Sequence, residues 1–178
     1  MNILIDLFAI LVLLMVIYLL GRPIVRGAIY FPTSHVQVDL MIRMASLKRG
    51  DVMADLGSGD GRMIIACARQ GIRAEGYEIN PLLVFLSRRD IRRAGLQDLA
   101  TVRWKSLWRA DLAPYDAVFV YGIPYIMDGL RRKLERELRP GAKVISNAFP
   151  FPDWAPLATE NKIYLYSIGP KSETVAAA

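Results

Sequence analysis

The stretch DLGSGDGR, residues 55–62, holds three glycines and two aspartates and directly follows the apolar residues 52–54. Glycine lets a backbone turn sharply and approach a ligand closely, so the stretch predicts a binding loop at the end of a strand. A phosphate ligand would be repelled by the carboxylates of Asp55 and Asp60. These residue types therefore indicate a ligand that is cationic at the end facing the loop.

The spacing of the glycines does not fit two common nucleotide-binding loops. A dinucleotide fingerprint counted from Gly57 needs a glycine at position 62, where this chain has Arg62. A Walker loop needs Gly-Lys-Ser or Gly-Lys-Thr, and neither follows the glycines. S-adenosylmethionine carries an amino group and a sulfonium, which the flanking carboxylates attract, so it is the cofactor predicted for this loop.

A second acidic residue agrees with this cofactor. Glu78 lies 21 residues after Gly57, where the second strand of a nucleotide-binding unit places an acid against the ribose. Its two oxygens can accept hydrogen bonds from both ribose hydroxyls. The alternative is a glycine turn with an unrelated surface glutamate, which requires both spacings to be coincidental.

Alternating strands and helices must position these residues. Apolar runs predict strands at 51–56, 73–79, 100–104, 116–122 and 142–149. Helical patterns lie between them at 60–70, 81–95 and 126–138, and a further helix follows the cap residues 32–34. Crossovers of this length predict an α/β fold with a Rossmann-like, doubly wound, mostly parallel sheet. The tail at 154–168 predicts two short strands that add an antiparallel edge.

Residues 3–20 form an apolar run whose one charge is Asp6. A helix of that length would extend about 27 Å, which just suffices to cross a bilayer. Arginines follow the run, so the positive-inside rule places the remaining chain in the cytoplasm. The sequence thus predicts a single-pass transmembrane anchor over 1–27 and one domain over 28–178, with a buried core helix as the alternative for the run.

The remaining composition narrows the chemistry. The single Cys67 cannot form an intrachain disulfide or a thiolate cluster, the single His35 lies beside a Pro-Thr-Ser loop, and we expect no metal. Much of the net charge of +6 comes from arginines at 87–93 and 130–139, where interleaved acids indicate solvated helix faces. We expect a bilayer as a partner and no nucleic acid, because no motif combines aromatic and basic residues for stacking.

The segments DLGSGDGR and GYEIN resemble the first motif and the following acidic position of class I, seven-strand, S-adenosylmethionine-dependent methyltransferases. The segments GAIYFPTS, YGIPYIMDGLRRKLEREL and FPFPDW are similar to a narrower group. This group is the membrane-associated protein-lysine methyltransferases of adenine nucleotide translocase and of the c-ring protein of ATP synthase, with their prokaryotic relatives. The resemblance implies methylation of lysine in a membrane protein.

The resemblance also implies a set of cofactor-binding residues, which are Asp55, Gly57, Ser58, Gly59, Asp60, Gly61, Glu78, Ile79, Asn80, Ser106, Leu107, Trp108 and Tyr121. Ser106 departs from the family, whose members tend to carry an acid before the Leu-Trp pair, and Asp111 is the nearest displaced acid. Ala148 stands where family members tend to have arginine.

The fourth predicted strand ends at YGIPY, residues 121–125, beside the expected position of the transferred methyl group. Enzymes that methylate planar amino groups commonly have an Asn or Asp at the position of Gly122, which offers no acceptor and leaves room for an aliphatic amine. We therefore predict Gly122, Pro124 and Tyr125 on the catalytic side. The predicted substrate residues, for each of which core packing is the alternative, are Phe149, Phe151 and Trp154.

Three functions stay open from the sequence. The favoured one is a membrane-anchored methyltransferase of lysine in a membrane protein, since an apolar pocket favours the neutral amine over the ammonium. The alternatives are a methyltransferase of a lipid or small amphiphile, and a tethered module that binds the cofactor without catalysis.

Overall fold

The computed structural model describes residues 3–26 and 33–170 of the chain. Its helices are α1 (Ile3–Arg26), α2 (His35–Ala45), α3 (Arg62–Arg69), α4 (Pro81–Arg93), the short 3-10 helix η1 (Leu107–Arg109) and α5 (Pro124–Glu137). Its strands are β1 (Val52–Leu56), β2 (Arg73–Glu78), β3 (Ala100–Trp104), β4 (Ala117–Val120), β5 (Lys143–Asn147), β6 (Ala158–Glu160) and β7 (Ile163–Ser167).

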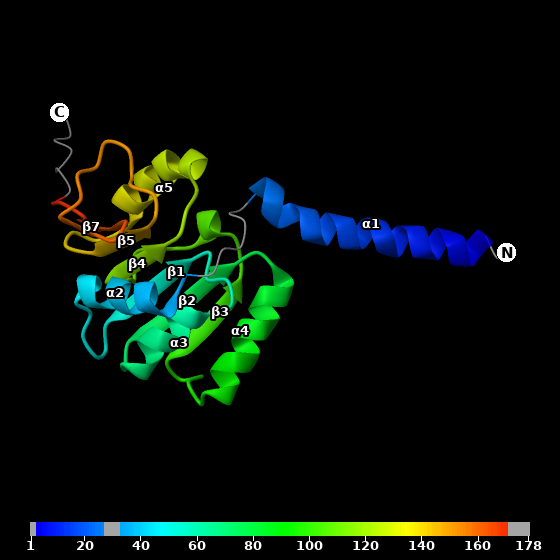
Figure 1. Cartoon of the computed structure of the whole chain (residues 1–178), viewed down its shortest axis with the longest axis horizontal. Helices are drawn as coiled ribbons and strands as arrows, with labels where there is room; N and C mark the ends of the chain where they lie inside the picture. The colour runs from blue at the N-terminus through cyan, green and yellow to red at the C-terminus, as the bar shows by residue number, and fades with distance from the viewer. Residues whose placement is uncertain (1–2, 27–32, 171–178) are drawn as a thin grey trace, which may run out of the picture.

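The seven strands form one mixed sheet of order β3-β2-β1-β4-β5-β7-β6 (Figure 1). Strands β1 to β5 pair in parallel, while β7 runs antiparallel to both β5 and β6. Asn161 and Lys162 join β6 to β7 with left-handed φ angles of 49° and 60°, as a tight hairpin turn requires. The predicted α/β fold with an antiparallel edge is confirmed.

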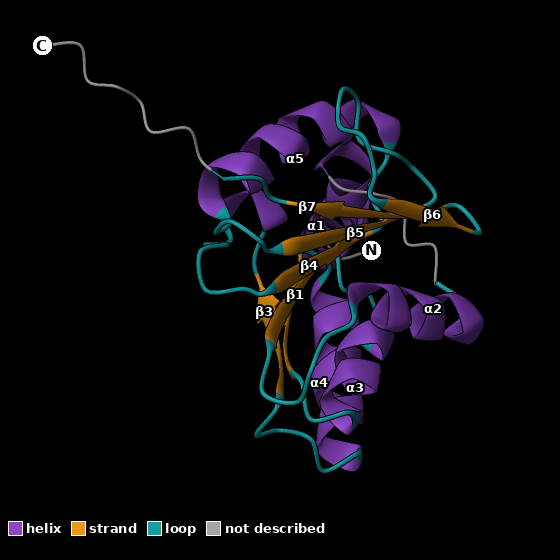
Figure 2. Ribbon diagram, turned by 90° about the vertical axis from the view of Figure 1, so that its left-hand side faces the viewer, coloured by secondary structure: helices purple, strands orange, loops and turns teal. Residues whose placement is uncertain are grey.

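Helices cover both faces of the sheet (Figure 2). Helices α2, α3 and α4 pack on one face, where Met53, Phe119 and Ile145 belong to the same buried cluster. Helix α5 covers the other face, where the cluster includes Leu56 and Val120. Side chains alternate along a strand, so consecutive residues of each strand lie on opposite faces of the sheet.

Two helices begin with capping residues that fix where the chain enters them. Ser34 and Gln37 form a capping box at the start of α2, in which Gln37 N donates to Ser34 Oγ at 3.3 Å. Asn80 accepts from Leu82 N at 3.0 Å at the start of α4, and Pro81 occupies the first helical position. Both caps lie near the carboxyl ends of the strands and so hold the edges of the site.

Helix α1 extends away from the sheet (Figure 1). Large apolar side chains in its first half are exposed, among them Ile3, Phe8 and Leu11 at 74%, 70% and 67%. The alternative of a buried core helix is therefore wrong for these residues. Within the described residues, no helix is both long and apolar enough to cross a membrane. The predicted domain boundary after residue 27 lies outside the described residues.

Candidate active site

The carboxyl ends of β2, β1, β4 and β5 meet at one edge of the sheet. Leu56 pairs with Tyr77 and with Val120, and Val120 pairs with Ser146. The residues that follow these pairs therefore lie at the same level. Gly57 lies beside Glu78 on one side and beside Tyr121 on the other. Asn147 lies beyond Tyr121. The register thus brings the glycine loop, its acidic partner and the predicted acceptor side together.

The glycine loop turns from β1 into α3 through left-handed backbone. Gly57, Gly59 and Gly61 have φ angles of 91°, 54° and 80°, which L side chains rarely adopt. A Cβ added to Gly57 would find no heavy atom within 4 Å, so the space beside this residue is open. Ser58 instead turns toward β2, where a Cβ on Gly76 would lie 2.5 Å from Ser58 Oγ. The loop therefore leaves its bare backbone beside an open space.

The carboxylate of Glu78 ties this loop to β2 and to the start of α4. Glu78 Oε2 accepts from Gly59 N at 3.0 Å, and Oε1 accepts from Ile79 N and Asn80 N at 2.8 Å each. An ionised carboxylate offers about four lone-pair sites, so about one stays available to a ligand on Oε2. The predicted bidentate contact with two ribose hydroxyls would therefore compete with one of these backbone bonds.

Three carboxyl groups gather beside the glycines. Asp55 is buried, and burial followed by the charges of Glu78 and Asp60 raises its pKa to about 7. Asp60 forms an ion pair with Arg62 at 2.7 Å. A cationic ligand group in the open space would relieve the repulsion on Asp55, whereas an anionic group would increase it. The electrostatics agree with the cation predicted from the sequence.

Two hydrogen bonds connect the start of α2 to the site. The sequence did not predict them. Arg62 Nη1 donates to the carbonyl oxygen of Thr33 at 2.7 Å, and Asn147 Nδ2 donates to Thr33 Oγ1 at 3.3 Å. The residue before the α2 cap is thus bound both to the glycine loop and to the end of β5. The one local signal for Asn147 is its place as a polar residue after the apolar run of β5.

The predicted adenine side lies where β2 and β3 end. Trp104 Nε1 donates to the carbonyl oxygen of Ile79 at 2.9 Å, which joins the two strand ends. Ser106 begins η1 and accepts from Trp108 N at 3.4 Å, and the Trp108 ring lies against Gly129 of α5. Half-buried Leu107 lies between them in the chain.

Asp111 is the acid that the sequence offered in place of one at Ser106. Asp111 Oδ1 accepts from Ala113 N at 3.1 Å and lies in an exposed turn beyond η1. Its carboxylate already stabilises that turn, and a contact with adenine stays a prediction.

On the acceptor side, Gly122 has a packing role. A Cβ at Gly122 would lie 2.5 Å from Sδ of Met127, so the absent side chain makes room for this residue of α5. Met127 occupies the space in this direction, and the predicted role of Gly122 in leaving room for the substrate stays a prediction. Pro124 is the first residue of α5, and Tyr125 follows it with 69% of its side chain exposed.

The predicted substrate aromatics divide into two groups. The rings of Tyr121 and Phe149 lie 6.4 Å apart beside the ends of β4 and β5. Phe151 is 3% exposed and packs against Trp154 and Tyr166 with ring centroids 5.4 and 5.2 Å away. Core packing, the alternative given for each aromatic, therefore describes Phe151, while Phe149 stays a predicted substrate residue.

Cys67 and His35 are the single cysteine and the single histidine of the chain, and their surroundings do not favour nucleophilic catalysis. Burial, together with the charge of Asp55, raises the pKa of the Cys67 thiol to about 12, so this thiol stays protonated. His35 begins α2 and is exposed. Among the described residues, no three potential ligands gather as a metal site would require.

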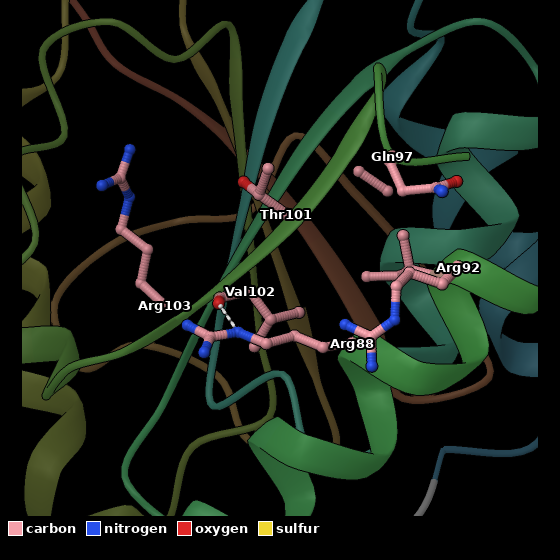
Figure 3. Close-up of a pocket in the computed structure, with 8 residues that line it drawn as sticks. Arg88, Arg92, Gln97, Thr101, Val102 and Arg103 are labelled. Carbon is pink, nitrogen blue, oxygen red and sulfur yellow. Dashed lines mark hydrogen bonds between the residues drawn. The ribbon is translucent and has the colours of Figure 1, made fainter. Parts of the chain in front are cut away.

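An open cavity of about 420 Å³ lies elsewhere, between the second half of α4 and the edge strand β3 (Figure 3). Its lining includes Arg88, Arg92 and Arg103 and none of the predicted site residues. Arg88 Nε donates to the carbonyl oxygen of Val102 at 2.9 Å, so this side chain covers free backbone at the sheet edge (Figure 3). The cavity is separate from the glycine loop.

The family model of the ANTKMT methyltransferase domain matches residues 55–158, from the glycine loop to β6. The chain belongs to this family. The matched region contains the glycine loop, Glu78, the YGIPY turn and the Phe149 loop, so the site assembled by the strand register is that of an ANTKMT methyltransferase domain.

Individual relatives agree with the family. The chain is 40% identical to the lysine N-methyltransferase of the ATP synthase C protein from Mus musculus over 149 residues, which are 80% of this chain and 60% of that protein. It is 30% identical to a protein-lysine N-methyltransferase of Saccharolobus islandicus, covering 79% of this chain and 93% of that protein. This chain thus spans less than two thirds of the length of the mouse relative.

A solved structure shares the fold. The crystal structure of an RNA methyltransferase from Salinibacter ruber in complex with S-adenosyl-L-homocysteine superposes with a TM-score of 0.76 at 37% identity. The match covers 78% of this chain and 94% of that chain.

Proposed function

We propose that this chain transfers a methyl group from S-adenosylmethionine to a lysine side chain of a membrane protein. The observation that carries the proposal is the group of three interacting carboxyls, Asp55, Asp60 and Glu78, at a glycine loop whose Gly57 adjoins open space. The names of the mouse and Saccharolobus relatives support lysine as the acceptor, and the S-adenosyl-L-homocysteine ligand of the Salinibacter structure supports the cofactor.

The residues of the loop fit this cofactor. Asp55 would face its ammonium group, the free lone pair of Glu78 Oε2 would accept from a ribose hydroxyl, and Ile79 and Leu107 would flank the adenine. When bound, the cofactor supplies a methyl group on a positively charged sulfur. Negative charge beside that sulfur favours binding of the charged cofactor over its neutral product, S-adenosylhomocysteine.

The acceptor lysine must reach this site as a neutral amine. The rings of Tyr121 and Phe149 provide apolar surface at the strand ends, and desolvation there lowers the pKa of an ammonium group. The exposed ring of Tyr125 lies at the start of α5, where it can contact the alkyl part of the side chain. The amine proton can leave to water before transfer, so no dedicated strong base is needed.

We also propose that residues 3–20 attach the chain to a membrane, with the methyltransferase domain on the cytoplasmic side. Support comes from the apolar sequence and from the exposed side chains of Ile3, Phe8 and Leu11. Exposed apolar side chains in such number favour contact with lipid or with another protein over contact with water. An attached domain would meet membrane-borne lysines at high local concentration.

Methylation of RNA is the competing function, because the Salinibacter structure carries that name. A planar amino group of a base is usually held by a side-chain acceptor at the position of Gly122, and glycine has none. Lipid methylation is the second competitor.

One experiment separates these functions. The full chain is incubated with native membranes, RNA and S-adenosylmethionine labelled in its methyl group, and protein, lipid and RNA are then separated. We expect label in protein, recovered as methyl-lysine after hydrolysis, and loss of label with Asp55→Asn. Label confined to lipid or RNA would contradict the proposal, and cofactor binding without any labelled product would indicate a non-catalytic module.

A further inference from the structure

Asn147 is a buried polar residue at the same edge as the glycine loop. It is the last residue of β5, follows the paired residue Ser146, and lies level with Gly57 across β4. Neighbouring strands are about 4.8 Å apart, so the backbones of Asn147 and Gly57 are about 10 Å apart. That distance leaves room for a methyl donor beside Gly57 and an amine beside Asn147.

The side chain of Asn147 lies on the same face of the sheet as that of Asp55. Along β5, Ile145 packs in the cluster under α2 and α3, and Asn147 follows it by two residues. Along β1, Met53 belongs to the same cluster, and Asp55 follows it by two residues. Asn147 also contacts Thr33, beside the start of α2. The Asn147 amide thus lies on the face that carries the buried carboxyl.

Within residues 3–26 and 33–170, the carbonyl oxygen of the Asn147 side-chain amide has no hydrogen-bond donor. The residue is 1% exposed, and Oδ1 is buried without a hydrogen bond among the residues that the structure describes, while Nδ2 donates to Thr33 Oγ1. A buried acceptor without a donor destabilises the folded chain, because it has lost its hydrogen bonds to water and gained none in return. A buried amide that carries this cost at the carboxyl edge of the sheet indicates a donor supplied by a ligand.

The backbone after Asn147 is held in an uncommon conformation. Ala148 has a φ angle of 68°, and Phe149 N donates to the carbonyl oxygen of Asn147 at 2.9 Å, which closes a three-residue turn. Ala148 N in addition donates to the carbonyl oxygen of Lys162 at 2.8 Å. These bonds fix the direction of Asn147 and leave Phe149 beside Tyr121, so the folded chain holds a strained backbone conformation next to the Asn147 amide.

We infer that Asn147 Oδ1 accepts a hydrogen bond from an N–H of the acceptor amine and so orients its lone pair toward the methyl group. The inference rests on the proposed function. The lone pair forms the new N–C bond while the C–S bond breaks, its electron pair stays on sulfur, and the methylated ammonium then releases a proton to water. A neutral amide serves this step better than a carboxylate, which would hold the amine in its protonated form.

The test compares three forms of the full chain: unmodified, Asn147→Leu and Thr33→Val. Thr33→Val is the matched control, because it removes the bond to Nδ2 and leaves Oδ1 in place. We expect kcat/KM for a lysine acceptor to fall about tenfold or more in Asn147→Leu and to fall clearly less in Thr33→Val, which keeps Oδ1. The Kd of S-adenosylhomocysteine should stay within about twofold in both.

Asn147→Asp gives an independent readout. A carboxylate at this position should hold the proton on the amine, so the pH profile of kcat should move upward by about one unit or more. Unmodified kcat/KM in Asn147→Leu, equal losses in Asn147→Leu and Thr33→Val, or an unmoved pH profile in Asn147→Asp would each overturn the inference. If Asn147→Leu does not bind S-adenosylhomocysteine, the inference is tested by the pH profile of kcat in Asn147→Asp alone. Absence of lysine methylation in the unmodified chain would contradict the proposed function instead.

Discussion

Asp55 is a buried carboxyl group beside two other acids, and its charge depends on what binds there. Burial first, and then Glu78 and Asp60, raise its pKa to about 7. An ordinary aspartate has a pKa near 3.8, so between these values the folded chain binds more protons than the unfolded chain. The free energy of unfolding therefore falls as pH rises through this range, and Asp55→Asn should remove that part of the dependence.

The same proton should control cofactor binding. Below about pH 7 Asp55 becomes neutral and loses its attraction for the cationic cofactor. We expect the Kd of S-adenosylmethionine to rise about fivefold to tenfold between pH 7.5 and pH 5.5, which calorimetry can measure. Asn at position 55 should flatten this change, and an equal slope in both proteins would show that another group titrates.

Glu78 connects the glycine loop to β2, so its removal should affect both binding and folding. Glu78→Ala deletes the acceptor of three backbone N–H groups and of the expected ribose contact. We expect the Kd of S-adenosylhomocysteine to rise about tenfold or more and Tm to fall. Glu160→Ala, at an exposed position of β6, is the control. Unchanged affinity in a folded Glu78→Ala variant would exclude Glu78 from the cofactor site.

In the short turn between β4 and α5, the side chain of Met127 lies close to the backbone of Gly122. Gly122→Ala would bring Cβ within 2.5 Å of Met127 Sδ, and overpacking of a buried contact costs about 1 to 3 kcal/mol. Chemical denaturation should show this loss. The double variant Gly122→Ala, Met127→Ala should be more stable than the sum of the two single changes predicts, because the shorter side chain removes the clash. Simple additivity would mean that the two residues do not oppose each other.

In the molecule as a whole, α1 presents apolar side chains outside the folded domain. Leu7 and Leu11 are 57% and 67% exposed, so replacing both by Asp should not disturb the core. We expect the double variant to lose most of its sedimentation with membranes after an alkaline carbonate wash while its Kd for S-adenosylhomocysteine stays unchanged. Leu157→Asp, an exposed leucine of the domain, is the control. Full release of the unmodified chain by the wash would contradict membrane attachment.

Features that depend on short stretches of chain could be predicted from the sequence. Periodicity predicted the strands and the α-helices of residues 35–168 within a few residues, because burial on one face repeats with the period of the element, whereas the short helix η1 was not predicted. The bare backbone of the glycine loop followed from φ angles that only glycine adopts easily, and Glu78 followed from the length of one βαβ unit.

Contacts between segments far apart in the chain came from the folded arrangement alone. The bond between Asn147 and Thr33 depends on how β5 and the start of α2 lie against each other, and no local pattern encodes that distance. Phe151 resembles a substrate aromatic in sequence, yet the β7 residue Tyr166 buries it. The close approach of Met127 to Gly122 likewise comes from the packing of α5 and has no signal in the sequence around Gly122. Strand register and helix packing set these neighbours, since they align residues regardless of their separation in sequence.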